Sequence, residues 1–312
     1  MDLLSDVIAT MRVGRAKFTR TRHAGPWGNR FGPYPGAGFH IVLEGRCWLV
    51  PPSGPPLVLT AGDVVFLPHG AQHGIASAPA SSPAVLPPAP PHDQGLDGTV
   101  DGPDAPDVQL LCGAYRLERG QVHPILQTMP DVVHLPGRLD RHPDLTAAVD
   151  LLGRNLEEQQ AGTEAALPAL LDLLLVYVLR AWLDEEAEGP RSTGWPAALA
   201  DPAIGSALQR MHRDPTYPWT VHSLGAVAGL SRTAFARRFA ALVGRPPLAY
   251  LTWWRLTTAA RLLRQTNQPL AAVARQVGYA SEFAFAAAFR REYGIAPGRY
   301  RRAGTASPPE GA

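Results

Sequence analysis

Lysine, cysteine and long apolar runs are scarce in this sequence, and each shortage excludes something. The 312 residues include one lysine, Lys17, and two cysteines, Cys47 and Cys112. Two cysteines are too few for a disulfide framework, and no CxxC pair indicates a zinc site. The amino terminus carries acidic residues where a secretory signal needs a basic flank, so we expect no such signal.

The most apolar stretch, Leu167–Leu183, is interrupted by Asp172 and Arg180. It is shorter than the roughly 20 residues of a membrane-spanning helix, and its charges disfavour insertion. The hydrophobic content of 46% is nevertheless sufficient for ordinary folded cores. These features predict a soluble, cytoplasmic protein with no membrane partner.

Charge is distributed unevenly along the chain. The formal net charge is +2, but residues 1–200 carry 14 basic and 22 acidic side chains, a net of −8. Residues 201–302 carry 15 arginines, no lysine and 4 acids, a net of +11. At roughly 150 residues per domain, the length suggests two domains. Their opposite charges indicate that one of them meets a polyanion and the other does not.

The first part of the chain has the pattern of short strands. Phe39–Val50 is apolar and rich in branched residues, and Leu57–Leu59 and Val64–Leu67 are further short apolar runs. A Pro/Gly-rich turn over 51–56 separates the first two. Closely spaced strands with such turns predict a small β-barrel or sandwich.

Residues 76–107 are dominated by Pro, Ala, Gly and Asp and have few large apolar side chains. This composition buries too little surface to offset the entropy lost on ordering, so we predict a disordered insert over 76–107. Strands resume at Val108–Leu117, which we expect to close the barrel.

Helical periodicity begins at Pro143. Apolar residues recur three or four apart up to Leu156, and a second helix is predicted from about Leu167 to Glu186, with a broad leucine stripe. Two interpretations of the stripe are open: it packs against its own barrel, or it forms a dimer interface. On the second, 143–188 is a helical dimerisation segment of a homodimer. Residues 189–200, rich in Gly and Pro, are the predicted linker.

Two similar units occupy the last hundred residues, at Val221–Gly244 and Leu270–Gly294. Each has the pattern of a short Ala-rich helix, a glycine turn, a serine cap and a second helix that ends at glycine. This is the layout of a DNA-binding helix-turn-helix. The turn glycines and capping serines are Gly229, Gly278, Ser231 and Ser281.

The second helix of each unit has one apolar face and one face of small or charged residues. Small residues let a helix enter a groove, and arginine binds guanine edges or phosphates. The second unit offers few donors, so it contacts either thymine methyl groups or mainly the backbone through its arginines. The predicted buried residues are Phe235, Phe239, Leu242, Phe285, Phe289 and Tyr293. The predicted DNA-binding residues are Arg232, Thr233, Ala236, Arg237, Ala240, Glu282, Phe283, Ala286, Arg290 and Arg291.

The segment Pro247–Thr266 between the units is predicted to be one helix. At about 1.5 Å per residue it spans roughly 30 Å. Successive major-groove faces of DNA repeat about every 34 Å. A rigid helix of this length can therefore hold two recognition helices in successive grooves.

This region resembles the DNA-binding domain of the AraC/XylS family of transcription regulators. The resemblance covers about Thr220–Arg302 and rests on AGLSRTAFARRFAALVGRPPLAYLTWWRL and PLAAVARQVGYASEFAFAAAFRREYGIAPGRYR. It implies an AraC-type domain over 201–302, double-stranded promoter DNA as partner, contact with RNA polymerase and, on balance, activation. Residues 303–312 are expected to be a disordered tail. The family often has polar or basic residues near 286 and 287, where this chain has alanines.

The strand-rich part resembles the cupins. The segment GDVVFLPHGAQH carries Gly62, Pro68, Gly70 and His73 at cupin spacing, and FHIVLEG supplies a histidine and a glutamate of the other cupin motif. Gly38 stands where the first histidine of that motif would be. The resemblance implies a cupin-like sensor domain over 1–142 that binds an unknown small-molecule effector.

His40, Glu44 and His73 form the candidate effector pocket. Two histidines and one carboxylate also match a ligand set for a divalent metal in the barrel. His40 and Glu44 are four apart, which places them on one face of a strand. The alternative is a degenerate barrel in which Glu44 begins a turn and the histidines are hydrogen-bonded structural groups.

Cys47 and Cys112 fall on predicted strands. They are either buried structural thiols or a redox-sensing pair, and the second requires Cα atoms within about 7 Å.

The sequence therefore predicts an α+β protein of two domains: a cupin-like β-barrel with trailing helices, and an all-α domain with two helix-turn-helix units. We expect a non-enzymatic transcription regulator that senses a small molecule or a redox signal. The alternative is a metallocupin enzyme fused to a DNA-binding module.

Overall fold

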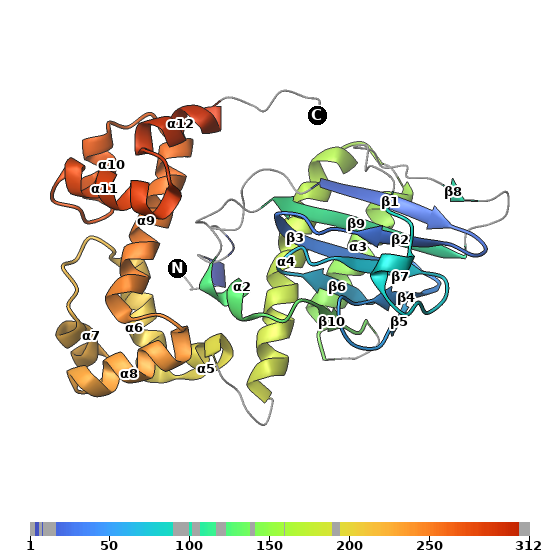
Figure 1. Ribbon diagram of the computed structural model, residues 1–312, viewed down its shortest axis with the longest axis horizontal. Coiled ribbons are helices and arrows are strands. Elements are labelled where there is room, and N and C mark those ends of the chain that lie inside the picture. Colours follow the sequence, from blue (N-terminus) through green and yellow to red (C-terminus); the bar gives the residue numbers. More distant parts are fainter. Residues whose placement is uncertain are drawn as a thin grey trace. The chain divides into compact units, whose positions relative to one another are not determined.

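The computed structural model describes residues 17–89, 100–101, 107–116, 123–137, 141–158, 160–188 and 194–305, together with Leu4, Ser5 and Ile8. The chain divides into two compact units (Figure 1). The sheet unit combines Met11–Glu118 with Leu126–Glu186. The helical unit combines Ala187–Ala312 with Met1–Thr10 and Arg119–Ile125. The predicted sensor domain over 1–142 is thus interrupted, because two short segments of it group with the helical unit.

The sheet unit is built on two sheets. Sheet A has the strand order β10-β6-β3-β9-β1-β8, and sheet B has the order β2-β7-β4-β5. The pairs are antiparallel except β1–β8. The strands are β1 (Lys17–His23), β2 (Gly28–Phe31), β3 (Gly36–Glu44), β4 (Arg46–Val50), β5 (Leu57–Thr60), β6 (Val64–Leu67), β7 (His73–Ala76), β8 (Val100–Asp101), β9 (Val108–Arg116) and β10 (Val133–Leu135). β9 pairs with both β1 and β3, so it lies inside sheet A rather than at a closing edge.

The apolar run Phe39–Val50 is divided between the sheets by a turn at Gly45. The φ of Gly45 is +81°, in the left-handed region, and a Cβ on this residue would lie 1.9 Å from the Asp107 carbonyl oxygen. Only glycine fits this close approach. β3 therefore ends in sheet A and β4 starts in sheet B. Side chains from both sheets share one buried cluster, which contains Val42, Cys47, Leu49, Leu59, Val65, Leu67, Ile75, Val108, Leu110 and Cys112.

Two helices of the sheet unit, α3 (Pro143–Glu158) and α4 (Thr163–Glu188), are tied to sheet A. The buried Arg20 guanidinium on β1 donates to the Leu156 carbonyl at 2.9 Å, where α3 has no backbone donor to offer. The Tyr115 hydroxyl on β9 donates to the Leu171 carbonyl of α4 at 2.7 Å. Apolar residues of both helices are buried, among them Leu152 and Leu156 of α3 and Leu171 and Leu179 of α4.

α4 is long and apolar enough to cross a membrane by length and composition alone. Core helices of soluble proteins satisfy the same criterion, and one such helix is weak evidence for a membrane span. In α4, 44% of this apolar window is buried, and Leu167, Leu171, Leu175 and Leu179 are at most 2% exposed.

The prediction of disorder over 76–107 is wrong for residues 76–89. Backbone bonds join Arg30 to Pro87 and Ala89 at 2.7 and 2.8 Å, and Ser77 to Trp27 at 2.9 Å. A short 3-10 helix, η1 (Pro83–Val85), is capped by Ser82. The segment is ordered because it lies along β2 and uses the free hydrogen-bonding edge of that strand. Of the rest of this insert, 90–99 and 102–106 lie outside the described residues.

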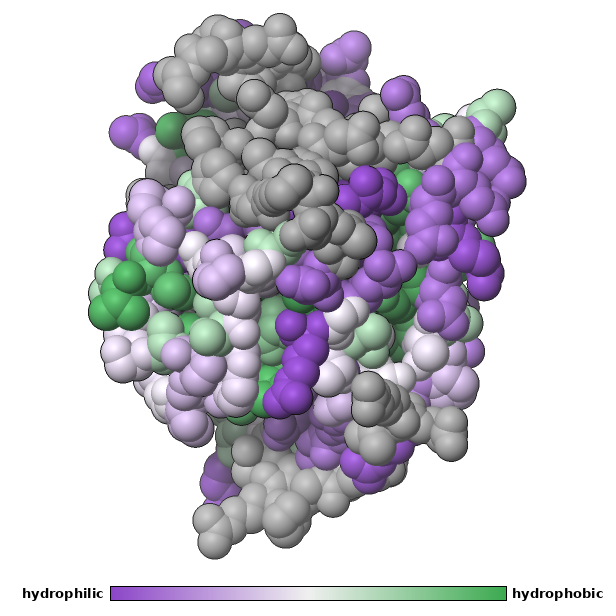
Figure 2. Space-filling view, turned by 90° about the vertical axis from the view of Figure 1, so that its right-hand side faces the viewer, coloured by the Kyte–Doolittle hydropathy of each residue, from purple (hydrophilic) through white to green (hydrophobic). Residues whose placement is uncertain are grey.

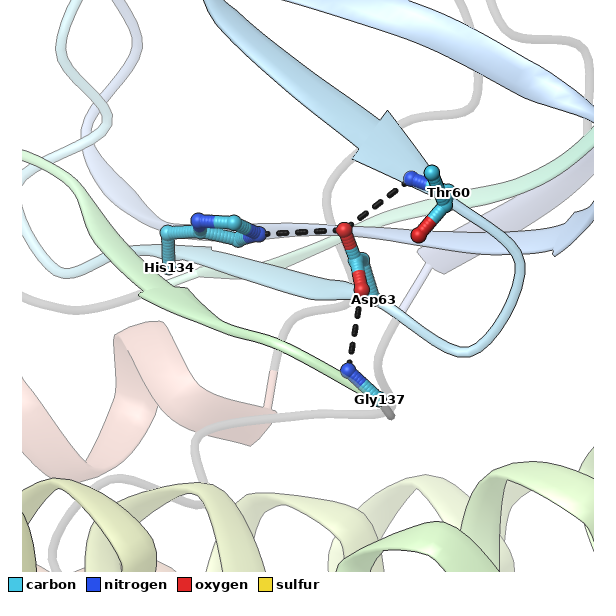
Figure 3. Close-up of polar contacts among 4 residues, drawn as sticks. All are labelled: Thr60, Asp63, His134 and Gly137. Atoms are coloured by element: carbon cyan, nitrogen blue, oxygen red, sulfur yellow. Dashed lines mark hydrogen bonds and ion pairs between the residues drawn. The ribbon is translucent and has the colours of Figure 1, made fainter. Parts of the chain in front are cut away.

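A buried carboxylate fixes the turn between β5 and β6 (Figure 3). Asp63 accepts hydrogen bonds from the Thr60 and Gly137 backbone N–H groups at 3.0 and 2.9 Å, and its oxygen lies 3.2 Å from His134 Nε2. Burial raises the pKa of Asp63, but the hydrogen bonds from His134, Gly137 and Thr60 outweigh it and bring the pKa below its usual value. The ionised carboxylate thus joins the turn to β10 and the residues after it.

The helical unit consists of short helices around a central long one. Its helices are α5 (Gly194–Ala200), α6 (Pro202–Arg213), α7 (Val221–Val227), α8 (Arg232–Val243), α9 (Pro247–Gln265), α10 (Leu270–Gln276), α11 (Glu282–Tyr293) and α12 (Pro297–Thr305); α2 (Pro124–Thr128) spans the boundary between the units. The predicted linker 189–200 is wrong from 194 onward, because α5 buries Trp195 and Ala198 completely. The predicted tail at 303–312 starts too early, since α12 continues to Thr305.

The surface is mixed in polarity. Outside the grey atoms, the face in Figure 2 carries hydrophobic residues in separate small patches among hydrophilic ones. This pattern is ordinary for a folded chain whose large apolar side chains lie inside.

Candidate nucleic-acid interface and sensor site

The first helix-turn-helix is α7–α8. Thr220 and Ser223 form a capping box at the start of α7, and Gly229 has the positive φ of +65° that the turn requires. Ser231 then caps α8 by accepting a hydrogen bond from the Ala234 N–H at 3.3 Å. α8 ends at Gly244 with a φ of +77°. The predicted turn and cap are confirmed.

The second unit, α10–α11, repeats this construction. Gly278 has a φ of +83°, Ser281 caps α11 through the Ala284 N–H at 3.4 Å, and Gly294 ends the helix. Four of the six predicted buried residues, Phe235, Phe239, Phe285 and Phe289, are fully buried. Leu242 and Tyr293 are only half-buried, and Val243 takes the third core position of α8.

The single helix predicted between the units is confirmed as α9. Its 19 residues give a length of about 28 Å. Arg255 on α9 donates to the Pro215 and Tyr217 carbonyls at 2.6 and 2.9 Å, which holds the loop before the first unit. A Cβ on Gly278 would lie 2.7 Å from the same Pro215 oxygen and 3.0 Å from the Arg255 guanidinium. One arginine therefore contacts both the loop before the first unit and the turn of the second.

The ten predicted DNA-binding residues all have accessible side chains. Arg232, Thr233 and Arg237 on α8 are exposed, as are Glu282, Phe283, Arg290 and Arg291 on α11. Ala236, Ala240 and Ala286 are half-buried. The faces assigned from the helical wheel are thus the outward faces, which is what contact with DNA needs.

Two adjacent arginines of α8 have opposite roles. Arg238 Nε donates to Asp201 Oδ2 at 2.6 Å and a second guanidinium nitrogen contacts the same oxygen. Asp201 is 8% exposed and also caps α6 by accepting from the Ala203 and Ile204 N–H groups. Arg237 is exposed and makes no hydrogen bond or salt bridge within the described chain. Arg237 is therefore available to an external anion, whereas Arg238 stabilises the domain.

The barrel interior holds a chain of three polar side chains. His73 Nδ1 lies 2.8 Å from the Ala71 carbonyl, so this nitrogen donates and Nε2 accepts. His40 Nε2, at 2.6 Å from His73 Nε2, must then donate, which leaves His40 Nδ1 to accept from the Cys112 thiol at 2.9 Å. Hydrogen-bond donation therefore runs from Cys112 through His40 and His73 to the Ala71 carbonyl. This arrangement requires neutral histidines and a protonated thiol.

The ionisation of these groups agrees with that assignment. Burial lowers the pKa of His73 to about 4, although the Ala71 carbonyl opposes the shift. Burial raises the pKa of Cys112 to about 12. The Phe31 ring lies against both histidines, at 4.8 and 5.3 Å between ring centroids. Phe31 thus forms an apolar wall of the buried cluster, and His73 and Cys112 are uncharged near neutral pH.

The structure does not place Glu44 with the histidines. A register shift between Val42 and Glu44 interrupts the alternation of β3, and Glu44 is exposed and accepts from Gln109 Nε2 at 2.5 Å. The inference that His40 and Glu44 share a face is wrong because of this bulge. No group of three His, Cys, Asp or Glu side chains suited to a metal occurs in the described part of the chain. The predicted ligand set of His40, Glu44 and His73 is thus not brought together in the structure.

Cys47 and Cys112 are both free and buried in the shared core cluster. Burial raises the pKa of Cys47 to about 12, with a further contribution from the charge of Asp63. Burial is also the main cause of the raised pKa of Cys112, with a smaller contribution from the charge of Cys47. Thiols with such pKa values react slowly with oxidants because the thiolate is the nucleophile.

Comparison with known proteins identifies the family. A cupin family profile matches residues 2–184, and a helix-turn-helix domain profile matches residues 224–303. A putative AraC-like transcription regulator of Streptomyces antibioticus is 34% identical over 309 residues, covering 97% of this chain and 99% of the relative. The chain belongs to the AraC-like transcription regulators. A Streptomyces lividans member is 33% identical, with 97% and 98% coverage.

A solved DNA-binding domain of the same type is similar in sequence to about a third of this regulator. The DNA-binding domain of AdpA, crystallised with a target DNA, is 34% identical and covers 36% of this chain and 99% of that domain, with a TM-score of 0.34. The two matching profiles show that this AraC-like regulator pairs a cupin domain with a helix-turn-helix domain, as the sequence resemblance implied.

Two features of the helical unit, the buried His123 and the position of Arg255, were not predicted from the sequence. His123 is fully buried in the helical unit, where its ring contacts Trp195 and Trp253 at 4.9 and 5.0 Å. Tyr250 lies beside it and bonds to His212 at 2.7 Å. The only sequence signal is a histidine in a polar stretch, which carries no periodicity. The position of Arg255 was equally invisible, since one arginine among 15 in this region shows no distinguishing pattern.

Proposed function

We propose that this regulator binds double-stranded promoter DNA with α8 and α11 in consecutive major grooves. The observation that carries the proposal is the pair of identically capped recognition helices joined by one helix of about 28 Å, close to the roughly 34 Å repeat of DNA. The outward arginines of both helices supply the positive charge that phosphates attract. The Arg237 and Arg290 side chains are the primary contacts.

The test is binding of the full-length chain to duplexes of its own upstream region at several salt concentrations. Each neutralised phosphate releases counterions, so log K should fall linearly with log salt with a slope of about −0.9 per contact. Steep salt dependence with preference over a scrambled duplex supports the proposal. Binding that is absent from every duplex, or independent of salt, contradicts it.

The sensor function is assigned to the buried chain of Cys112, His40 and His73. Because every member of this buried chain is paired, breaking one of its bonds would leave a buried polar group unsatisfied and would be felt along the whole chain. We assign it to a small polar effector that competes for the bond between the two histidines. Glu44 is no longer part of the pocket.

A thermal-shift screen of small polar compounds tests the assignment, because a ligand that binds only the folded state raises the unfolding midpoint. His73→Gln should abolish the shift, while Glu44→Gln should leave it intact. A shift that survives in His73→Gln places the effector elsewhere.

A redox signal is the second candidate function of this region, since Cys47 and Cys112 are free thiols in one buried cluster. Replacing Cys112 or Cys47 by Ser and comparing DNA affinity with and without oxidant distinguishes it. An unchanged oxidant response in both variants excludes thiol sensing. The high thiol pKa values predict a slow reaction.

Dimerisation through 143–188 is assigned to the outward side of α4. Leu173 is 39% exposed, and Leu170, Val176 and Tyr177 beside it are half-buried. These residues lie at helical spacing on one side, and a second copy of the chain would cover them. Sedimentation of Leu173→Glu, compared with Asp172→Asn, tests this: only the first should shift the chain toward monomer. Activation through RNA polymerase and a cytoplasmic location complete the proposal.

A further inference from the structure

The recognition helix α11 exposes a large aromatic side chain. Phe283, in its first turn, is 87% exposed, more than Val85 at 64% or Tyr217 at 47%. The other phenylalanines of the two recognition helices are fully buried. A phenylalanine held in water by a rigid helix indicates an apolar contact that forms on binding.

Equivalent positions of the two recognition helices carry opposite chemistry. At the first, second and sixth positions after the serine caps, α8 has two arginines and a threonine, whereas α11 has a carboxylate, a phenylalanine and an alanine, all exposed. Their N-terminal turns have the same capping geometry, with bonds of 3.3 and 3.4 Å. The matched pairs are Arg232 with Glu282, Thr233 with Phe283, Ala236 with Ala286, Arg237 with Ala287, and Ala240 with Arg290.

The face of α11 begins with the Glu282 carboxylate, is apolar from Phe283 through its next turn and is cationic at its C-terminal end. Phe283, Ala286 and Ala287 lie at helical spacing, and Arg290 follows one turn later. The N-terminal residues of a recognition helix contact base edges, so the apolar part is the part that meets bases. In the major groove the apolar group is the C5-methyl of thymine.

We propose that α11 recognises thymine through its C5-methyl group and that Phe283 is the specificity-determining residue, while α8 recognises its subsite by hydrogen bonds. The inference rests on the proposed DNA-binding function and deepens it. The small side chains of Ala286 and Ala287 let the helix approach the base edges closely enough for contact. Arg290 holds a phosphate at the end of the same face, and Glu282 disfavours phosphate at the start of it.

The operator should therefore be asymmetric in chemistry. One subsite, under α8, carries bases with hydrogen-bond acceptors such as guanine. The other, about one helical turn away, carries thymine at one or two positions.

The experiment begins with duplexes selected by the full-length chain from a randomised pool. Each thymine in the selected duplex is then replaced by deoxyuridine, which removes only the methyl group and keeps base pairing. We expect affinity to fall about fourfold per contacted methyl, the value of one buried methyl-sized group, in the α11 subsite only. Uracil in the α8 subsite should have no effect.

The variant Phe283→Ala connects the effect to the residue. It should weaken binding to the thymine duplex and bind the thymine and uracil duplexes equally. Phe283 is exposed and alanine favours helix, so thermal unfolding should be unchanged. Leu248→Ala, which removes a 41%-exposed apolar side chain at the start of α9, is the matched control and should keep the full methyl effect.

Uracil without effect at every position, in a chain that binds the thymine duplex with steep salt dependence, overturns this inference and leaves the proposed function standing. The same holds if Phe283→Ala changes self-association but not DNA affinity, which would make Phe283 a contact between copies. Loss of all DNA binding by the wild-type chain overturns the proposed function instead.

Discussion

The neighbouring side chains Arg237 and Arg238 give the sharpest single prediction. Both belong to α8, but the first is exposed without a partner among the described residues, and the second is bonded to Asp201. Replacing each by alanine removes the same positive charge. DNA affinity should fall in Arg237→Ala, and stability should fall in Arg238→Ala.

The magnitudes follow from the contacts. A bidentate arginine contact with guanine provides about 1–3 kcal/mol, so Arg237→Ala should weaken specific binding roughly 5- to 150-fold and reduce preference over a scrambled duplex. Arg238→Ala removes charged hydrogen bonds to a nearly buried carboxylate. Because the guanidinium itself is half-exposed, we expect a loss of about 1–2 kcal/mol, or roughly 5–10 °C in the unfolding midpoint of the helical unit.

The assays are fluorescence anisotropy with specific and scrambled duplexes, and thermal unfolding of the same preparations. Arg237→Lys adds a further test, since lysine keeps the charge but cannot form the bidentate contact. Arg237→Lys should keep the salt dependence of DNA binding seen in the wild type but lose the preference over a scrambled duplex. The reasoning is refuted if Arg238→Ala weakens specific binding more than Arg237→Ala while leaving the unfolding midpoint unchanged.

Four further predictions follow from the structure. The pKa of His73 is about 4 in the folded protein and about 6.5 in the unfolded chain. The contribution of this group to the free energy of unfolding should therefore be fully present above pH 6.5 and should fall by about 3 kcal/mol down to pH 4. His73→Gln should flatten this part of the pH profile of urea unfolding. Asp63→Ala should cost about 1–3 kcal/mol in the same urea assay, since two half-buried N–H groups lose their acceptor. The stability that this carboxylate contributes is lost only in acid, below its usual pKa. Gly278→Ala should lower the unfolding midpoint more than Gly294→Ala, because both have positive φ but only the first has backbone 2.7 Å from a Cβ. Glu44→Gln should leave metal content, measured by elemental analysis, identical to that of the wild type.

The helical unit was largely predictable because its signals are local. Glycine at a turn, serine at a cap and phenylalanine three or four apart act within one or two helical turns, and the positions of Ser231 and Ser281 follow directly from them. The outward face of each recognition helix then follows from helical periodicity alone.

The sheet unit was less predictable because its decisive features are long-range. The bulge after Val42 depends on pairing with Gln109, and it rotates Glu44 away from the histidines. The ordered segment at 76–89 has a disorder-like composition but is held by the backbone of Arg30, on another strand. Neither contact leaves a pattern in its own stretch of sequence.

The partner of Cys112 was also beyond the sequence. His40 is paired with it across β3 and β9, a register that no local motif specifies. The direction of hydrogen bonding through both histidines follows only once the Ala71 carbonyl is placed.

The central claim is that α8 and α11 occupy consecutive major grooves on one face of promoter DNA. Hydroxyl-radical footprinting of the full-length chain on its upstream region measures this directly. The account predicts two protected patches on the same face, about 10 base pairs apart, with the patch under α11 lost in Arg290→Ala and Arg291→Ala together. A single patch, or two patches on opposite faces, would contradict it.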